Sequence, residues 1–162
     1  MALAQQSIPT PSQVHGRYWL AESKAARTPW SINILLVEDD AADASLILSA
    51  LRRHPDVAAA HAMNKPETAL RLLASGSLQP DLILLDIHMP RIDGFEFVER
   101  LRDIPTMLDT PVVFLTTSRL AKNVEAARDT SVCLYVVKPD SFADLQARLD
   151  VVIKRAKSGE WS

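Results

Sequence analysis

From residue 32 onward, short apolar runs alternate with amphipathic stretches. The apolar runs predict five strands, at Ile32–Val37, Val57–Ala62, Asp81–Leu85, Pro111–Thr116 and Cys133–Val137. Between and after them, apolar residues recur at helical spacing and predict helices near Ala41–Arg53, Pro66–Ser75, Phe95–Arg102, Leu120–Arg128 and Phe142–Lys157. Four of the five strand runs are almost wholly apolar, which is typical of strands covered by helices on both faces, whereas the second, VAAAHA, suits a sheet edge. Five strand–helix units in series predict a doubly wound, parallel α/β fold.

Polar residues at the helix boundaries agree with this pattern. Asp40 is predicted to cap the helix that follows it, Asn64 lies before Pro66 at the start of another, and Ser141 can cap the last one. Within that last helix a core-facing stripe is predicted from the spacing of its apolar residues, namely Phe142, Leu145, Leu149 and Val152.

Residues 1–31 differ from the rest of the chain because they lack a sustained core periodicity. They are rich in proline and polar residues, yet they also carry Tyr18, Trp19, Leu20 and Trp30. Two interpretations stay open: a poorly ordered leader, or an arm that packs on the domain or on a second subunit. We therefore divide the chain into an N-terminal extension (1–31), one domain (32–157) and a C-terminal tail (158–162), whose Trp161 is a further candidate for dimer or partner contacts.

Composition excludes several classes of protein. The 162 residues are 48% hydrophobic and 23% charged, as in an ordinary globular protein, and the net charge of −2 gives no reason to expect nucleic-acid or membrane binding. The lone Cys133 precludes an internal disulfide, no apolar stretch approaches the roughly 18 residues of a membrane span, and the N-terminus lacks the features of a signal peptide. A cytoplasmic location is expected.

Charged and hydroxyl side chains follow four of the predicted strands. Glu38 and Asp39 follow the first strand, Asp86 follows the third, Thr116 ends the fourth and is followed by Thr117, and Lys138 follows the fifth. Ligands of doubly wound sheets bind beyond the carboxyl ends of the strands, so these side chains are expected at one rim. Clustered carboxylates raise one another's pKa values unless a cation neutralises them, and oxygen ligands suit Mg²⁺. Acids, Mg²⁺, a hydroxyl and a lysine together indicate phosphate chemistry.

Four motifs at these strand ends make the chain resemble the receiver domain of bacterial two-component response regulators. They are ILLVEDD, PDLILLDIHMPRIDGFE, VVFLTTS and YVVKP, in this order. The resemblance covers about residues 32–157 and implies a flavodoxin-like five-stranded sheet with strand order 2-1-3-4-5 and helices on both faces.

The resemblance also implies a role for each residue at the predicted rim. Asp86 would accept a phosphoryl group from a histidine kinase, while Glu38 and Asp39 would bind Mg²⁺ together with Asp86. The backbone carbonyl of His88, rather than its imidazole, would be a further metal ligand.

The remaining motif residues would read out phosphorylation. Lys138 would pair with the phosphoryl group and Thr116 would donate its hydroxyl to it, while Tyr135 would move as the aromatic switch. The change would remodel the surface formed by the fourth helix, fifth strand and fifth helix. The bond between Lys138 and Pro139 resembles the cis peptide of the family.

Finer features suggest where in the family the chain belongs. The LTTS sequence resembles small regulators partnered with bacterial phytochrome kinases, a group that often forms homodimers. The chain departs from the common pattern at DTSVC before the fifth strand and at Asp140 after the KP pair.

Two other functions compete with a phosphorylatable switch. A pseudo-receiver scaffold would have lost phosphorylation, although Asp39, Asp86, Thr116 and Lys138 are all present. A phosphatase of the haloacid dehalogenase type would need a second acid two residues after its nucleophile, where this chain has His88. We expect a signalling protein that catalyses only its own phosphoryl transfer and slow hydrolysis, not a turnover enzyme.

Overall fold

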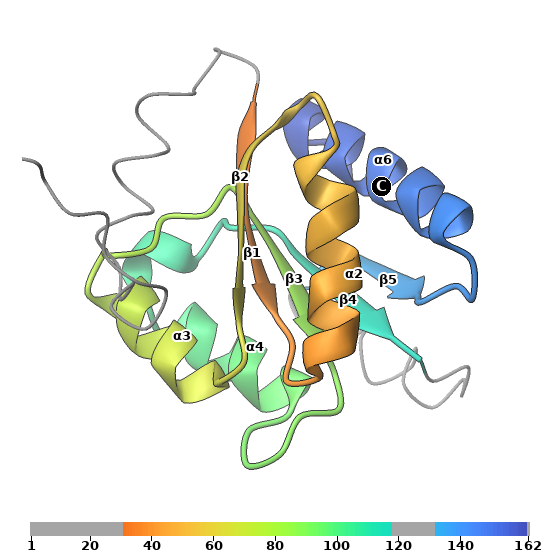
Figure 1. Cartoon of the computed structure of the whole chain (residues 1–162). Coiled ribbons are helices and arrows are strands. Elements are labelled where there is room, and N and C mark those ends of the chain that lie inside the picture. The colour runs from red at the N-terminus through yellow and green to blue at the C-terminus, as the bar shows by residue number, and fades with distance from the viewer. Residues whose placement is uncertain (1–30, 118–131, 162) are drawn as a thin grey trace, which may run out of the picture.

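A computed structural model of the chain describes residues 31–117 and 132–161. Their core is a five-stranded parallel sheet in the order β2-β1-β3-β4-β5, as predicted. The strands are β1 (Ile32–Val37), β2 (Val57–Met63), β3 (Leu82–Asp86), β4 (Val112–Thr116) and β5 (Leu134–Val137). The weak second run forms an edge strand, and the buried β3 lies in the centre (Figure 1).

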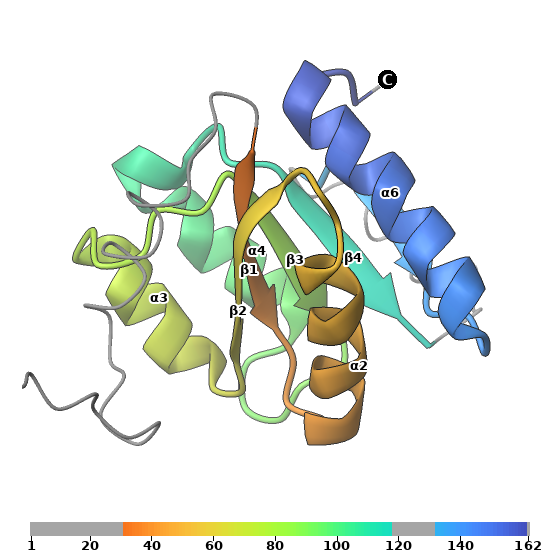
Figure 2. The same cartoon turned by 45° about the horizontal axis from the view of Figure 1, so that its top comes forward.

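Helices cover both faces of the sheet. They are α2 (Ala41–Arg52), α3 (Pro66–Ala74), α4 (Gly94–Arg102) and α6 (Phe142–Ser158), with a short 3₁₀ helix, η2 (Pro105–Met107), after α4. α2 and α6 lie on one face, and α3 and α4 on the other (Figures 1 and 2). The predicted helix near Leu120–Arg128 and the N-terminal extension lie outside the described residues.

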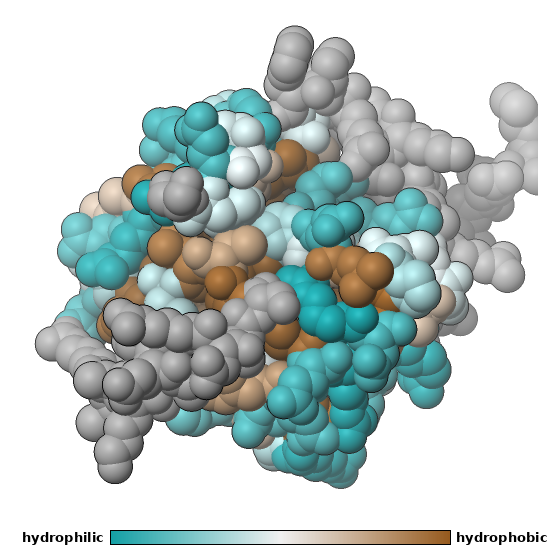
Figure 3. Space-filling view, turned by 180° about the vertical axis from the view of Figure 1, so that it is seen from behind, coloured by the Kyte–Doolittle hydropathy of each residue, from teal (hydrophilic) through white to brown (hydrophobic). Residues whose placement is uncertain are grey.

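The sheet separates two apolar cores because successive side chains of a strand point to opposite faces. Leu35 and Val37 of β1 pack with α3 and α4, whereas Ile34 and Leu36 pack with α2 and α6. Trp161 packs partly buried against the second core, so the structure gives this predicted partner residue an intramolecular contact. Seen from behind, some apolar residues of the described part of the chain lie at the surface (Figure 3).

The helix caps agree with prediction at two of three positions. The Asp40 carboxylate accepts from the Asp43 backbone, and the Ser141 hydroxyl accepts from the Asp144 backbone. Asn64 does not cap α3: the residue before the helix is Lys65, which makes no side-chain cap because its ammonium has no acceptor atom, and Pro66 takes the first helical position as predicted. Within the described residues, no helix is long and apolar enough to cross a bilayer.

Candidate phosphoryl-acceptor and metal site

Three carboxylates meet at the carboxyl ends of β1 and β3. Ligand oxygens of Glu38, Asp39 and Asp86 all lie within 4.8 Å of one another. β1 and β3 are paired neighbours, with Val37 opposite Leu85, so the residues that follow in each strand lie side by side. The sequence prediction that these acids gather at one rim is confirmed.

The three acids differ sharply in exposure. Glu38 is 1% exposed and Asp86 7%, whereas Asp39 lies at the surface. Burying a carboxylate is costly unless its charge is paired. Two of the three acids therefore need a nearby cation, and the third lies where a solvated ion can approach.

Burial changes the proton affinity of both inner acids. It raises the pKa of Asp86, an effect that the charge of Lys138 and the backbone N–H of His88 oppose and the charge of Asp39 reinforces. Burial likewise raises the pKa of Glu38, against the hydrogen bonds from Lys138 and from the Asp40 backbone. Raised pKa values mean that the ionised acids are not fully compensated by the protein's own charges.

Lys138 is the cation at this cluster, but two other acids lie closer to its ammonium than Asp86 does. Its Nζ donates to Glu38 Oε2 at 2.6 Å and to Asp43 Oδ2 at 2.8 Å, while Asp86 Oδ1 is 3.9 Å away. Burial alone would lower the pKa of Lys138, but the hydrogen bonds to Asp43 and Glu38 and the charge of Asp86 outweigh it, and the pKa is raised. The sequence pattern does not mark Asp43 as a site residue, because an acid in the first turn of a helix is ordinarily explained by the helix dipole.

The cis-peptide expectation is wrong: the bond between Lys138 and Pro139 is trans. Lys138 is oriented instead by its two carboxylate partners and by its backbone N–H, which donates to the Thr116 carbonyl at 2.8 Å. That hydrogen bond continues the β4–β5 pairing past its last strand residue. The backbone of Lys138 is therefore held in place by the hydrogen-bonded pairing of β4 and β5.

The predicted switch residues lie on β4 and β5. Thr116 is 1% exposed at the end of β4, and Tyr135 is half-buried on β5. The Tyr135 ring packs edge-on against Phe114, with centroids 5.2 Å apart and planes at 64°, and burial raises the pKa of its hydroxyl to about 12. Thr117, which also follows β4, is exposed.

The loop after Asp86 returns tightly to the site. The Gly94 N–H, at the start of α4, donates to the Ile87 carbonyl at 2.9 Å. Asp93 caps α4, and its carboxylate accepts from the Glu96 backbone N–H. Arg91 has φ +71° in a turn closed by the Ile92 N–H and the Pro90 carbonyl, a strained conformation for a residue with a side chain. The His88 side chain is exposed.

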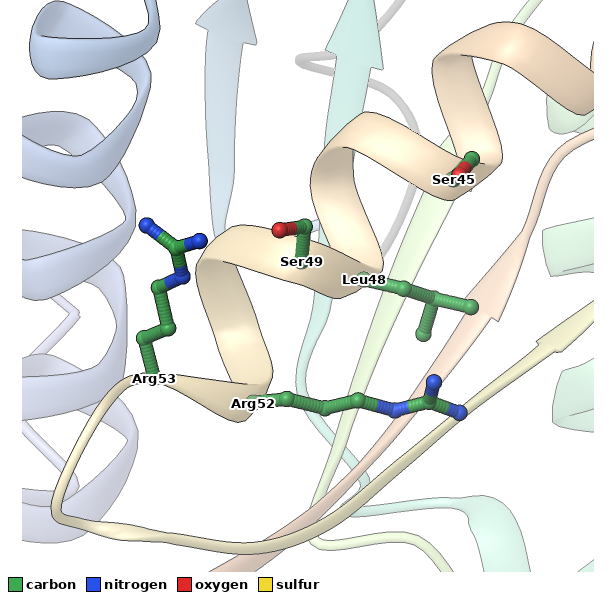
Figure 4. A pocket seen from close by; sticks show the side chains of 5 residues that line it. All are labelled: Ser45, Leu48, Ser49, Arg52 and Arg53. Atoms are coloured by element: carbon green, nitrogen blue, oxygen red, sulfur yellow. The ribbon is translucent and has the colours of Figure 1, made fainter.

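A hollow of about 350 Å³ lies on the outer surface of α2 (Figure 4). Its arginines have structural contacts: the Arg53 guanidinium lies 5.6 Å from the centre of the Phe142 ring, and Arg52 donates to the Ala60 carbonyl at 3.5 Å. The lining residues are Ser45, Leu48, Ser49, Arg52 and Arg53. None of them belongs to the acidic cluster.

Comparison with known proteins places this arrangement in a family. The profile of the response regulator receiver domain matches residues 34–150. This chain is a receiver domain. Its curated relatives include the probable methanogenesis regulatory protein FilR2 of Methanothrix harundinacea, 32% identical over 123 residues that cover 74% of this chain and 79% of FilR2. Another is the transcriptional regulatory protein KdpE of Escherichia coli, 34% identical over 76% of this chain but only 52% of KdpE.

Solved structures agree with the family and the fold. The phosphorylated cyanobacterial phytochrome response regulator RcpA superposes with a TM-score of 0.70 at 29% identity, covering 80% of this receiver domain chain and 96% of RcpA. The Mn²⁺-bound response regulator Rcp1 gives a TM-score of 0.66 at 31% identity, covering 75% and 91% of the two chains. The chain therefore has the response regulator fold, and it carries a cluster of three carboxylates of the kind that holds divalent ions.

Proposed function

We propose that this receiver domain is a signalling switch that accepts a phosphoryl group on Asp86 from a histidine kinase. The observation that carries the proposal is the convergence of Glu38, Asp39, Asp86 and Lys138 at the ends of three strands. Asp86 ends a fully buried central strand, so its carboxylate has a fixed position. Such a rigid nucleophile suits in-line transfer, in which positioning and charge stabilisation supply most of the catalysis.

The transfer balances with the residues present. An Asp86 carboxylate oxygen forms a bond to phosphorus as the bond between phosphorus and the imidazole nitrogen of the donor histidine breaks. The imidazole leaves with the electron pair of that bond and takes up a proton. Asp86 then carries the phosphoryl group as an acyl phosphate.

Mg²⁺ is the proposed cofactor, and the residues fit it. Three carboxylates within 4.8 Å form an all-oxygen donor set, and the raised pKa values of Glu38 and Asp86 indicate uncompensated negative charge. Glu38, Asp39, Asp86 and the carbonyl of His88 would hold the ion. When bound, it would neutralise charge that develops on the transferring phosphoryl oxygens.

Lys138 and Thr116 are the proposed contacts to the phosphoryl group. The Lys138 ammonium lies 3.9 Å from Asp86 Oδ1, and Thr116 is buried at the neighbouring strand end. Tyr135 lies on the adjacent β5, packed against Phe114. A rearrangement of these side chains would change the surface around β5 for dimerisation or partner binding.

Two further proposals concern the class of kinase that phosphorylates the domain and its oligomeric state. Similarity to RcpA, which is a cyanobacterial phytochrome response regulator, supports a phytochrome kinase as the donor. A homodimer as the working form rests on the sequence resemblance alone. A cytoplasmic location and a role for residues 1–31 in dimerisation stay predictions. Deleting residues 1–31 and measuring mass by light scattering tests the last of these, since an unchanged mass would contradict it.

Intact-mass spectrometry tests phosphorylation. The protein is incubated with Mg²⁺ and a small phosphodonor such as acetyl phosphate, and then with candidate kinases. We expect one phosphoryl adduct that is absent from Asp86→Asn and from protein treated with a chelator. An adduct that persists in Asp86→Asn would move the acceptor elsewhere. Its absence from the wild type with every donor would favour the pseudo-receiver, and release of free phosphate from unrelated monoesters would favour the phosphatase.

A further inference from the structure

The ammonium of Lys138 is shared between two acids that lie on either side of it. Glu38 Oε2 accepts at 2.6 Å and Asp43 Oδ2 at 2.8 Å, both within hydrogen-bonding distance. Asp86 Oδ1, at 3.9 Å, is too far to accept. The side chain proposed to serve the phosphoryl group is therefore committed to other partners.

Asp43 has a fixed place in this arrangement. Its backbone N–H donates at 2.8 Å to the carboxylate of Asp40, the residue that caps α2, so the first turn of the helix orients it. Its side chain is 39% exposed, whereas the side chains of Glu38 and Lys138 are 1% and 11% exposed. Asp43 thus holds Lys138 from the solvent side of the site, and it is not a member of the three-carboxylate group.

We propose that Asp43 is a positioning residue that holds Lys138 in the unphosphorylated arrangement and so opposes the arrival of a phosphoryl group. This inference rests on the proposed function of Asp86. A phosphoryl group brings a charge of about −1.5 to −2 that competes with Asp43 for the same ammonium. The Asp43 carboxylate, close to the same place, also repels that charge. Asp43 therefore sets how strongly the switch resists activation.

The existence of this pair can be tested without metal or phosphate. Urea unfolding in a chelating buffer is compared for the wild type, Asp43→Asn, Lys138→Met and the double variant. Because a partly buried ion pair couples its members, we expect Asp43→Asn to raise the unfolding equilibrium constant about threefold to tenfold when Lys138 is present. In the Lys138→Met background the effect should vanish or reverse. Equal effects in both backgrounds would overturn the proposal.

The opposition to a phosphoryl group is tested with beryllium fluoride, a phosphoryl analogue, by titration calorimetry at an Mg²⁺ concentration that saturates each variant. We expect Asp43→Asn to bind it about threefold to tenfold more tightly than the wild type, because no pair must be given up. Unchanged or weaker binding would overturn the proposal, and weaker binding would make Asp43 a support for Lys138 instead of a competitor.

Asp144→Asn is the matched control. Asp144 lines the same pocket as Lys138, is exposed, and makes no ion pair with it among the described residues. Its removal changes the formal charge equally, but a screened charge should alter binding by less than about twofold near 0.15 M salt. An effect as large as that of Asp43→Asn would assign the result to general charge and overturn the proposal. If the wild type binds no beryllium fluoride, the proposed function fails and the inference fails with it. Coupling between Asp43 and Lys138 in the unfolding of metal-free protein would then show that the ion pair exists and that the phosphoryl step is the part that failed.

Discussion

Gly94 offers a sharp test of how closely the backbone packs behind the acceptor. A Cβ placed on Gly94 would lie 2.8 Å from the Asp86 carbonyl oxygen, 2.8 Å from Cε1 of Phe114 and 2.9 Å from Cα of Ile87. Ordinary van der Waals contacts of a Cβ are 3.4–4 Å, so each of the three distances is short by about 0.5 Å or more. Two of the three atoms are backbone and the third belongs to a fully buried ring. A rotamer change cannot relieve the crowding.

We therefore expect Gly94→Ala to lower the free energy of unfolding by about 3 kcal/mol, the upper end of the range for overpacking a core. In a domain of this size the melting temperature should fall by about 6–12 °C. Because α4 would have to move away from the segment that carries Asp86, phosphorylation by a small phosphodonor should also slow. Urea unfolding followed by circular dichroism and intact-mass kinetics measure the two effects.

Gly76→Ala is the control for backbone conformation alone. Gly76 has φ +74°, and the nearest atom to its added Cβ lies 3.8 Å away, at the end of the Gln79 side chain. This variant should lose only the cost of a left-handed backbone, about 1–2 kcal/mol, and should keep its phosphorylation rate. If Gly94→Ala proved no more destabilising than Gly76→Ala, the close approach of α4 to β3 would be refuted.

Three further predictions concern charge and capping. Burial raises the pKa values of Asp86 and Glu38 in the folded state, so the folded protein holds their protons more tightly than the unfolded chain does. The protonated side chains therefore add to the free energy of unfolding in full below the ordinary carboxyl pKa, and this contribution is lost as the pH rises through the raised pKa values. In metal-free protein, Asp86→Asn should thus stabilise the fold at neutral pH by about 1–2 kcal/mol, with a gain that shrinks on acidification, and a loss of stability at pH 7 in urea melts would contradict this. Since the pKa of Tyr135 is about 12, comparison of the wild type with Tyr135→Phe by ultraviolet absorbance should show no phenolate from this residue at pH 10.5, whereas a step near pH 10 would place the ring in water. Ser141→Ala removes the cap of α6 and should cost about 1 kcal/mol in urea unfolding, and a cost near zero would mean that the packing of α6 makes the cap redundant.

Elements with a buried apolar face could be predicted from the sequence to within a residue or two. The β1 run has no polar residue except Asn33, and its predicted and observed ranges coincide. The weak VAAAHA run was correctly predicted to form an edge strand because few large apolar side chains occur in it. The gathering of Glu38, Asp39 and Asp86 followed from the topology alone, since parallel strands place their carboxyl ends at one rim.

What the sequence could not supply was the choice among competing polar contacts. Asn64 and Lys65 both precede Pro66, and only backbone geometry decides which one lies at the helix boundary. Likewise, no local pattern says that Lys138 reaches Asp43 before Asp86, because the choice depends on differences of about an ångström between side chains from three elements. The roles of individual site residues stay predictions until phosphorylation is measured.

The hydrogen bond between Lys138 and Glu38 joins residues 100 positions apart in the chain. Glu38 follows β1 and Lys138 follows β5, and β3 and β4 lie between these two strands in the sheet, so this contact depends on the placement of every strand from β1 to β5. A half-folded chain in which β1 and β3 have paired but β5 has not would hold Glu38 and Asp86 together without the charge of Lys138 beside them. The ability to be phosphorylated would then arise only when the fold is complete, and a kinase would transfer phosphate to few incompletely folded molecules.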